Sequence, residues 1–133
     1  VDVLRDAASG FAETPYFAST GSGTGAGTGS NADVFGAAYL RYLPGVADPY
    51  SAKAPGNPYR SWALKITQAE AAKVFGVSGI TTVSVTARYN GGLVKTLTAR
   101  TATGKAKSVT LPAATWISKL KVNGPWITSI TAK

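Results

Sequence analysis

The stretch that decides the fold is Ile80–Thr101, which reads ITTVSVTARYNGGLVKTLTART. Ile80 to Tyr89 is rich in Thr and Val, and polar and apolar side chains alternate from Thr82 to Tyr89, which is typical of a strand with one buried face. Asn90-Gly91-Gly92 follows, and these residue types tolerate the positive φ angles of a tight hairpin turn. Leu93 to Thr101 is then the returning strand. The stretch therefore predicts an antiparallel β-hairpin.

The chain after this hairpin predicts a third strand, a helix and a last strand. Thr103-Gly104-Lys105 is a second turn, and Lys107 to Leu111 is the third strand of a meander. Pro112 suits the first position of a short helix over 112–120, because a proline there removes an amide that has no helical partner. Alternation returns over 126–132, so we predict a strand there as well.

The chain before the hairpin predicts another strand and a capped helix. The strand spans Ser61 to Ile66, and one of its faces carries Trp62, Leu64 and Ile66. Thr67-Gln68-Ala69-Glu70 is a capping box, in which the Thr67 hydroxyl and the Glu70 carboxylate each satisfy a free amide at the start of a helix. We expect this helix to end at Phe75, because Gly76 suits the position after a helix.

The first part of the chain is dominated by glycine. Glycine occupies every second position from 21 to 29, which excludes a helix because each glycine costs about 1 kcal/mol relative to alanine. We predict a strand over Tyr16–Thr20, an exposed loop over 21–38, a packed apolar segment over Tyr39–Leu43 and a turn-rich, proline-containing crossing over 44–60. The predicted fold class is α+β: an antiparallel β-meander with two short helices and a long Gly-rich loop, in one domain over 1–133.

The composition excludes several kinds of chemistry. The 133 residues include no Cys, His or Met, which excludes a Ser-His-Asp triad and argues against a zinc site. We predict no metal and no cofactor. No apolar run approaches the roughly 20 residues that cross a bilayer, so no membrane span is expected. Residue 1 is Val and no signal-peptide pattern follows it, so we expect an upstream segment to be missing.

Charge is distributed unevenly along the chain. Residues 1–50 carry two basic and five acidic side chains, whereas residues 51–133 carry twelve basic side chains and one acidic side chain, Glu70. The second part therefore suits an anionic partner, and nucleic acid and an anionic cell-wall polymer are the two candidates. We expect the other carboxylates of interest, Glu13, Asp33 and Asp48, to be turn or cap residues.

Four short motifs follow one another at a recognisable spacing. They are Tyr16–Gly21, Asp33-Val34-Phe35-Gly36 with Tyr39-Leu40, Asp48-Pro49-Tyr50 leading to Trp62, and Ile80–Arg100 around Gly91-Gly92. In order and spacing they resemble the stage II sporulation protein D (SpoIID/LytB) family, over roughly residues 10–130. Gly21-Ser22-Gly23-Thr24 departs from the family's Gly-Gly-x-Thr.

The resemblance implies that the chain acts on bacterial peptidoglycan, outside the cell at the cell wall. The family's sporulation enzyme is a lytic transglycosylase, and its acidic catalytic residue lies in an N-terminal helix with a Glu…Leu-Lys-Ala-Gln-Ala pattern that this chain lacks. We therefore expect a secreted peptidoglycan-binding domain that is non-catalytic on its own. The expected ligand-binding residues are Tyr16, Ser19, Thr20, Gly21, Thr24, Phe35 and Tyr39.

Two alternatives stay open at the level of sequence. In the first, the chain is itself a lytic transglycosylase, and Glu13 or a residue of an N-terminal companion segment is the general acid. In the second, the chain is a structural subunit of an extracellular assembly and its partner is a companion segment or another copy of itself. Nucleic acid is suggested by charge alone and is the least supported partner.

Overall fold

The computed structural model describes residues 28–50, 53–57 and 62–131, and these form an α+β fold. Within them, an antiparallel sheet of order β1-β2-β3 is accompanied by three short helices. The elements in chain order are α1 (Asn31–Phe35), α2 (Gln68–Phe75), β1 (Ile80–Arg88), β2 (Val94–Thr101), β3 (Ala106–Thr110) and α3 (Ala113–Leu120). The predicted fold class, with its β-meander and the helices after residues 67 and 112, is confirmed.

The central hairpin forms as its sequence predicts. β1 and β2 pair antiparallel, with Val83 opposite Ala99 and Val85 opposite Leu97. Gly91 and Gly92 make the turn with φ angles of 90° and 98°, a region that favours glycine. The pairing register shifts between residues 80 and 82 and again between 85 and 88. Such irregularities increase the local twist of a sheet.

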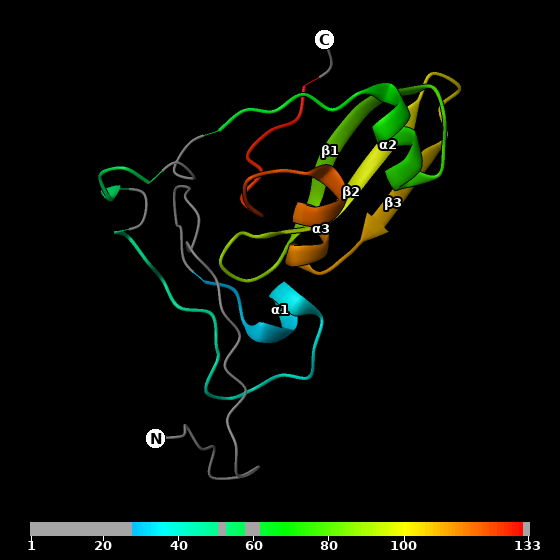
Figure 1. Cartoon of the computed structure of the whole chain (residues 1–133). Coiled ribbons are helices and arrows are strands. Elements are labelled where there is room, and N and C mark those ends of the chain that lie inside the picture. Colours follow the sequence, from blue (N-terminus) through cyan, green and yellow to red (C-terminus); the bar gives the residue numbers. More distant parts are fainter. Residues whose placement is uncertain (1–27, 51–52, 58–61, 132–133) are drawn as a thin grey trace.

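The hydrophobic core lies between one face of the sheet and helices α2 and α3, which cover the same face in Figure 1. β2 is the central strand, so its Val94 and Leu97 are fully buried there. Phe75 of α2 and Trp116 of α3 meet above them, with ring centroids 6.4 Å apart. The buried Trp116 ring also donates a hydrogen bond from Nε1 to the Lys95 carbonyl at 2.9 Å, so its polar atom is satisfied.

The start of α2 confirms the predicted capping box. The Glu70 amide donates to Thr67 Oγ1 at 3.2 Å, and the Thr67 amide donates to Glu70 Oε2 at 2.9 Å. Gly76 ends the helix in the left-handed conformation. Helix α3 begins one residue later than predicted, because Pro112 is its N-cap and not its first helical residue. The Pro112 carbonyl accepts hydrogen bonds from the amides of Thr115 and Trp116.

Two predicted strands are wrong. Residues 62–67 and 126–131 have no regular secondary structure. Trp62 packs against the core, but Leu64 and Ile66 on the same predicted face stay exposed. In the last segment Trp126 and Ile127 are consecutive and both buried, which no strand with one buried face allows. In both segments apolar and polar residues alternate in the sequence. The structure holds them by side-chain packing and not by the hydrogen bonds of a β-ladder.

Candidate functional site

Helix α1 lies inside the segment that the sequence predicts as loop, and the loop prediction over 21–38 is wrong at this helix. Ser30 is its N-cap and accepts a hydrogen bond from the Asp33 amide at 3.2 Å. Gly36 follows the helix in the left-handed conformation, and its amide donates to the Ala32 carbonyl at 2.8 Å. Both signals are visible in the sequence as a capping serine and a terminal glycine, but the glycine run before them obscures the helix.

Helix α1 is fixed to the body of the fold through a small second apolar cluster. Val34 packs against buried Leu93, Ala113 and Trp126. Gly29 allows this close approach, because a Cβ there would lie 2.8 Å from Val34 Cγ2 and 2.9 Å from a Leu93 methyl carbon. Figure 1 shows α1 beside the β1–β2 turn and the start of α3.

A buried asparagine holds the chain that follows α1. Asn31 is 5% exposed, and its Nδ2 donates to the Ala38 carbonyl at 2.6 Å. Its Oδ1 accepts from the Leu40 amide at 2.8 Å. Its backbone amide donates to the Leu43 carbonyl at 3.1 Å. One side chain therefore satisfies backbone groups that lie seven and nine residues further along the chain.

The two ends of this segment are joined to each other. The Thr28 amide donates to the Val46 carbonyl at 2.7 Å, and the Val46 amide donates to Thr28 Oγ1 at 2.9 Å. We call residues 28–46 the clamped loop, because Thr28 and Val46 close its base and Asn31 holds its interior. Compact loops with joined ends are frequently functional.

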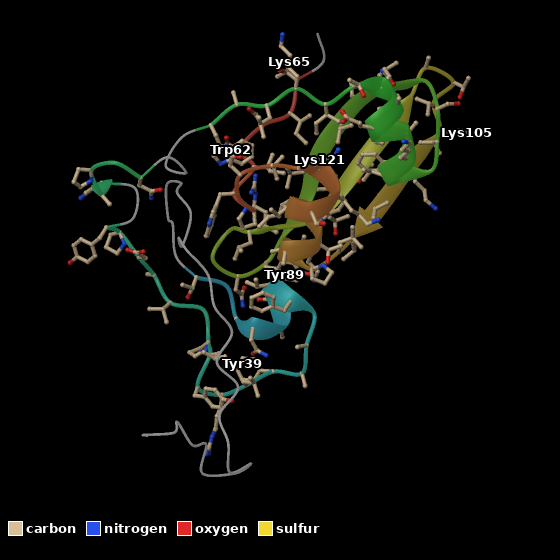
Figure 2. All side chains as sticks on the ribbon, viewed as in Figure 1. Tyr39, Trp62, Lys65, Tyr89, Lys105 and Lys121 are labelled. Atoms are coloured by element: carbon tan, nitrogen blue, oxygen red, sulfur yellow. The ribbon has the colours of Figure 1, made fainter. Side chains whose placement is uncertain are left out.

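The clamped loop presents two aromatic rings to solvent. Phe35 is 47% exposed and Tyr39 is 60% exposed, and both belong to the predicted ligand-binding set. The prediction of a packed apolar segment over 39–43 is wrong for Tyr39, because the backbone there is held by Asn31 and not by burial of the ring. Figure 2 shows Tyr39 at the end of the molecule that α1 occupies.

The remaining predicted site residues have no described position. Glu13, Tyr16, Ser19, Thr20, Gly21 and Thr24 lie outside the described residues, as does the predicted strand over 16–20. The structure therefore places two of the predicted ligand-binding residues on one loop and leaves the others as predictions. Thr28 and Asn31 were missed, because their partners are distant in sequence and no local pattern announces them.

The structure describes three carboxylates, those of Asp33, Asp48 and Glu70. Asp33 lies in the first turn of α1, and Asp48 Oδ1 accepts a hydrogen bond from the Tyr50 amide at 2.9 Å, as in a turn. Hydrogen bonds from the Thr67 amide and then the Thr67 hydroxyl hold the pKa of Glu70 below its ordinary value. A general acid for glycoside cleavage needs a raised pKa, so Glu70 does not fit that role.

A partly buried tyrosine packs against the apolar cluster that Val34 of α1 also contacts. Tyr89 donates a hydrogen bond from its hydroxyl to the Leu111 carbonyl at 3.1 Å, and Lys95 Nζ lies 5.3 Å from the centre of its ring. Burial, and to a smaller degree the charge of Asp33, raises the pKa of Tyr89. This hydroxyl is therefore un-ionised at neutral pH and serves to join β1 to the start of α3.

The part of the chain that the structure describes contains no group of three acidic, His or Cys side chains that could hold a metal ion. None of the helices in that part is long and apolar enough to pass through a bilayer. Comparisons of the chain with protein-family models, with curated proteins and with solved structures give no match. The resemblance to the sporulation family therefore rests on the sequence motifs alone.

Proposed function

We propose that this chain is a secreted binding module for cell-wall glycan, and that it contacts peptidoglycan through Phe35 and Tyr39 of the clamped loop. The observation that carries the proposal is that two exposed aromatic rings stand on a loop held by a buried asparagine. Rings held in place by their backbone lose less conformational freedom on binding than rings on a loose loop. Their apolar faces suit the C–H faces of sugar rings.

Two further observations support peptidoglycan as the ligand. The residues of the family motif, Asp33-Val34-Phe35-Gly36 and Tyr39-Leu40, all lie within the clamped loop and include both exposed rings. The second part of the chain has a large excess of basic side chains, twelve against one over 51–133. That excess attracts a cell wall that carries carboxylates and phosphates.

The proposed module binds without cutting when it acts alone. The family's catalytic Glu…Leu-Lys-Ala-Gln-Ala pattern is not found in this sequence, and hydrogen bonds from Thr67 lower the pKa of Glu70, which does not suit a general acid. Cleavage as a lytic transglycosylase requires Glu13 or a carboxylate from a companion chain. Release of anhydro-sugars by the isolated chain, abolished by Glu13→Gln, would establish that alternative in place of simple binding.

The proposal is tested by sedimentation with purified, insoluble peptidoglycan at low salt. We expect the wild-type chain to be retained and the double variant F35A/Y39A to bind at least about tenfold more weakly, which is about 1.4 kcal/mol. The matched control is Leu64→Ala, which removes an exposed apolar side chain from another segment and is expected to bind like wild type. Equal retention of all three proteins contradicts the proposal.

A second variant tests the hydrogen bonds of Asn31 without changing either aromatic ring. Asn31→Ala removes both side-chain hydrogen bonds to the loop and leaves the Ala38 carbonyl and the Leu40 amide without that partner. Because a hydrogen bond of this kind contributes about 0.5–1.5 kcal/mol to stability, loss of both makes the loop less ordered. We expect Asn31→Ala to weaken glycan binding although Phe35 and Tyr39 are intact. The control is Asn123→Ala, which changes an exposed asparagine.

A further inference from the structure

The end of the sheet remote from the clamped loop is strongly cationic. Residues 71–133 contain nine Lys and Arg residues and no Asp or Glu. Three of the nine, Arg100, Lys105 and Lys107, lie in the single tight hairpin that joins β2 to β3, and all three are exposed. Figure 2 shows Lys105 and Tyr39 at opposite ends of the molecule.

The geometry of this hairpin distributes the three cations around its tip. Arg100 is opposite Ala106 and Ala99 is opposite Lys107 in the antiparallel register. The Thr101 amide donates to the Lys105 carbonyl at 2.9 Å, which closes the turn. Because neighbouring side chains alternate between the faces of a strand, Arg100 and Lys107 project to opposite faces. Together with Lys105 in the turn, they surround the tip of the hairpin. We call residues 100–107 the basic tip.

The sheet face that carries Arg100 is polar and ordered. Hydroxyls of Thr86, Thr98 and Ser108 form a row across the three strands, with oxygen–oxygen distances of 2.9 and 2.8 Å. Thr96 and Thr110 make a second cross-strand pair at 2.7 Å. Thr98 in the middle of the first row is buried, whereas Thr86, Ser108 and Thr110 are exposed and are the hydroxyls that a ligand can reach.

We propose that the basic tip and the adjoining hydroxyl face bind a linear anionic polymer of the phosphodiester-linked polyol class. Phosphodiester oxygens accept hydrogen bonds from Lys, Arg and hydroxyl donors, and no carboxylate on the three strands or their turns opposes them. This site is separate from the clamped loop and does not depend on glycan binding there.

The same face argues against single-stranded nucleic acid as the occupant. Proteins that bind single strands combine cations with aromatic rings on which the bases stack. The hydroxyl rows present Thr and Ser, and the residues of β1, β2 and β3 include no Phe, Tyr or Trp. A polymer of phosphate and polyol needs no such ring.

The test measures binding of the whole chain to purified poly(glycerol phosphate) by titration calorimetry at several salt concentrations. The variant R100Q/K105Q/K107Q removes the three charges of the tip. The matched variant K53Q/K65Q/K119Q removes three exposed charges from other segments and has the same net charge. We expect at least about tenfold weaker binding for the first variant and less than about threefold for the second. The slope of log K against log salt falls by about two for the first variant, because fewer ions are released.

Several outcomes overturn the proposal. If the wild-type chain does not bind poly(glycerol phosphate), the proposal is wrong. Equal losses of affinity in the two triple variants would show that only the net charge of the chain matters. Tighter binding of a single-stranded oligonucleotide of equal charge, lost in R100Q/K105Q/K107Q, assigns the tip to nucleic acid instead. Equal binding of polyglutamate removes the preference for phosphate. F35A/Y39A is expected to bind poly(glycerol phosphate) like wild type, which separates this result from the test of the clamped loop.

Discussion

Two glycines show at the residue scale how the same backbone conformation has different consequences. Gly92 and Gly104 both adopt left-handed φ angles, 98° and 83°. A Cβ at Gly92 would lie 2.9 Å from Trp126 Cζ3, whereas a Cβ at Gly104 would meet nothing within 4 Å. The two positions therefore separate backbone strain from steric crowding.

We expect Gly104→Ala to lower the free energy of unfolding by about 1 kcal/mol, the cost of strain alone. Gly92→Ala is expected to cost about 1–3 kcal/mol more, because Trp126 must shift within a packed cluster. Denaturant unfolding of both variants measures the difference. Equal losses would show that the Trp126 contact has no energetic weight.

The role of Asn31 could not be predicted from the sequence. Ser30 and Gly36 bound α1 by local rules, so this helix is encoded in the sequence around it. The partners of Asn31 are backbone groups at positions 38, 40 and 43, and an asparagine carries no pattern that names them. Phe35 and Tyr39 entered the predicted site through the family resemblance, and only the structure shows that both rings are exposed.

At the scale of elements, the capping box of α2 predicts how the stability of the fold depends on pH. The folded state lowers the pKa of Glu70 through its hydrogen bonds with Thr67, so the carboxylate stabilises the fold at pH values above its ordinary pKa of 4.5. This contribution is lost as pH falls through the lowered folded-state value. Thr67→Ala, which removes the cap itself, is expected to cost about 1 kcal/mol at neutral pH.

The measurement compares the unfolding free energy of wild type and Glu70→Gln as a function of pH. Wild type is expected to be the more stable protein at neutral pH, and the difference is expected to vanish in strong acid, where Glu70 is protonated. A difference that stays constant or grows as pH falls would exclude the capping carboxylate as its source.

The strands show why some elements follow from sequence and others do not. β1 and β2 are joined by the five residues 89–93, so each alternating segment has its partner beside it in the chain. Residues 62–66 alternate equally well, yet they form no strand, although β1 and β3 each pair on one side only. Local periodicity predicts which face a segment can bury, but it does not decide whether the segment pairs with a strand that is distant in the chain.

At the scale of the whole molecule, two surfaces lie at opposite ends of the fold. The clamped loop presents aromatic rings beside α1, and the basic tip presents cations where β2 turns into β3. Sequence charge alone predicted that the second part of the chain suits an anionic partner. It could not place the cations, because they gather at the tip through strand pairing.

The central claim is that the clamped loop is the glycan-contacting surface. The most direct measurement is a series of ¹H–¹⁵N spectra of the whole chain titrated with soluble peptidoglycan glycan strands that lack stem peptides. The amides of residues 35–40 and the side-chain amide of Asn31 are expected to shift together, with one dissociation constant. Shifts confined to the basic tip, or unchanged loop signals at saturating glycan, would contradict the claim.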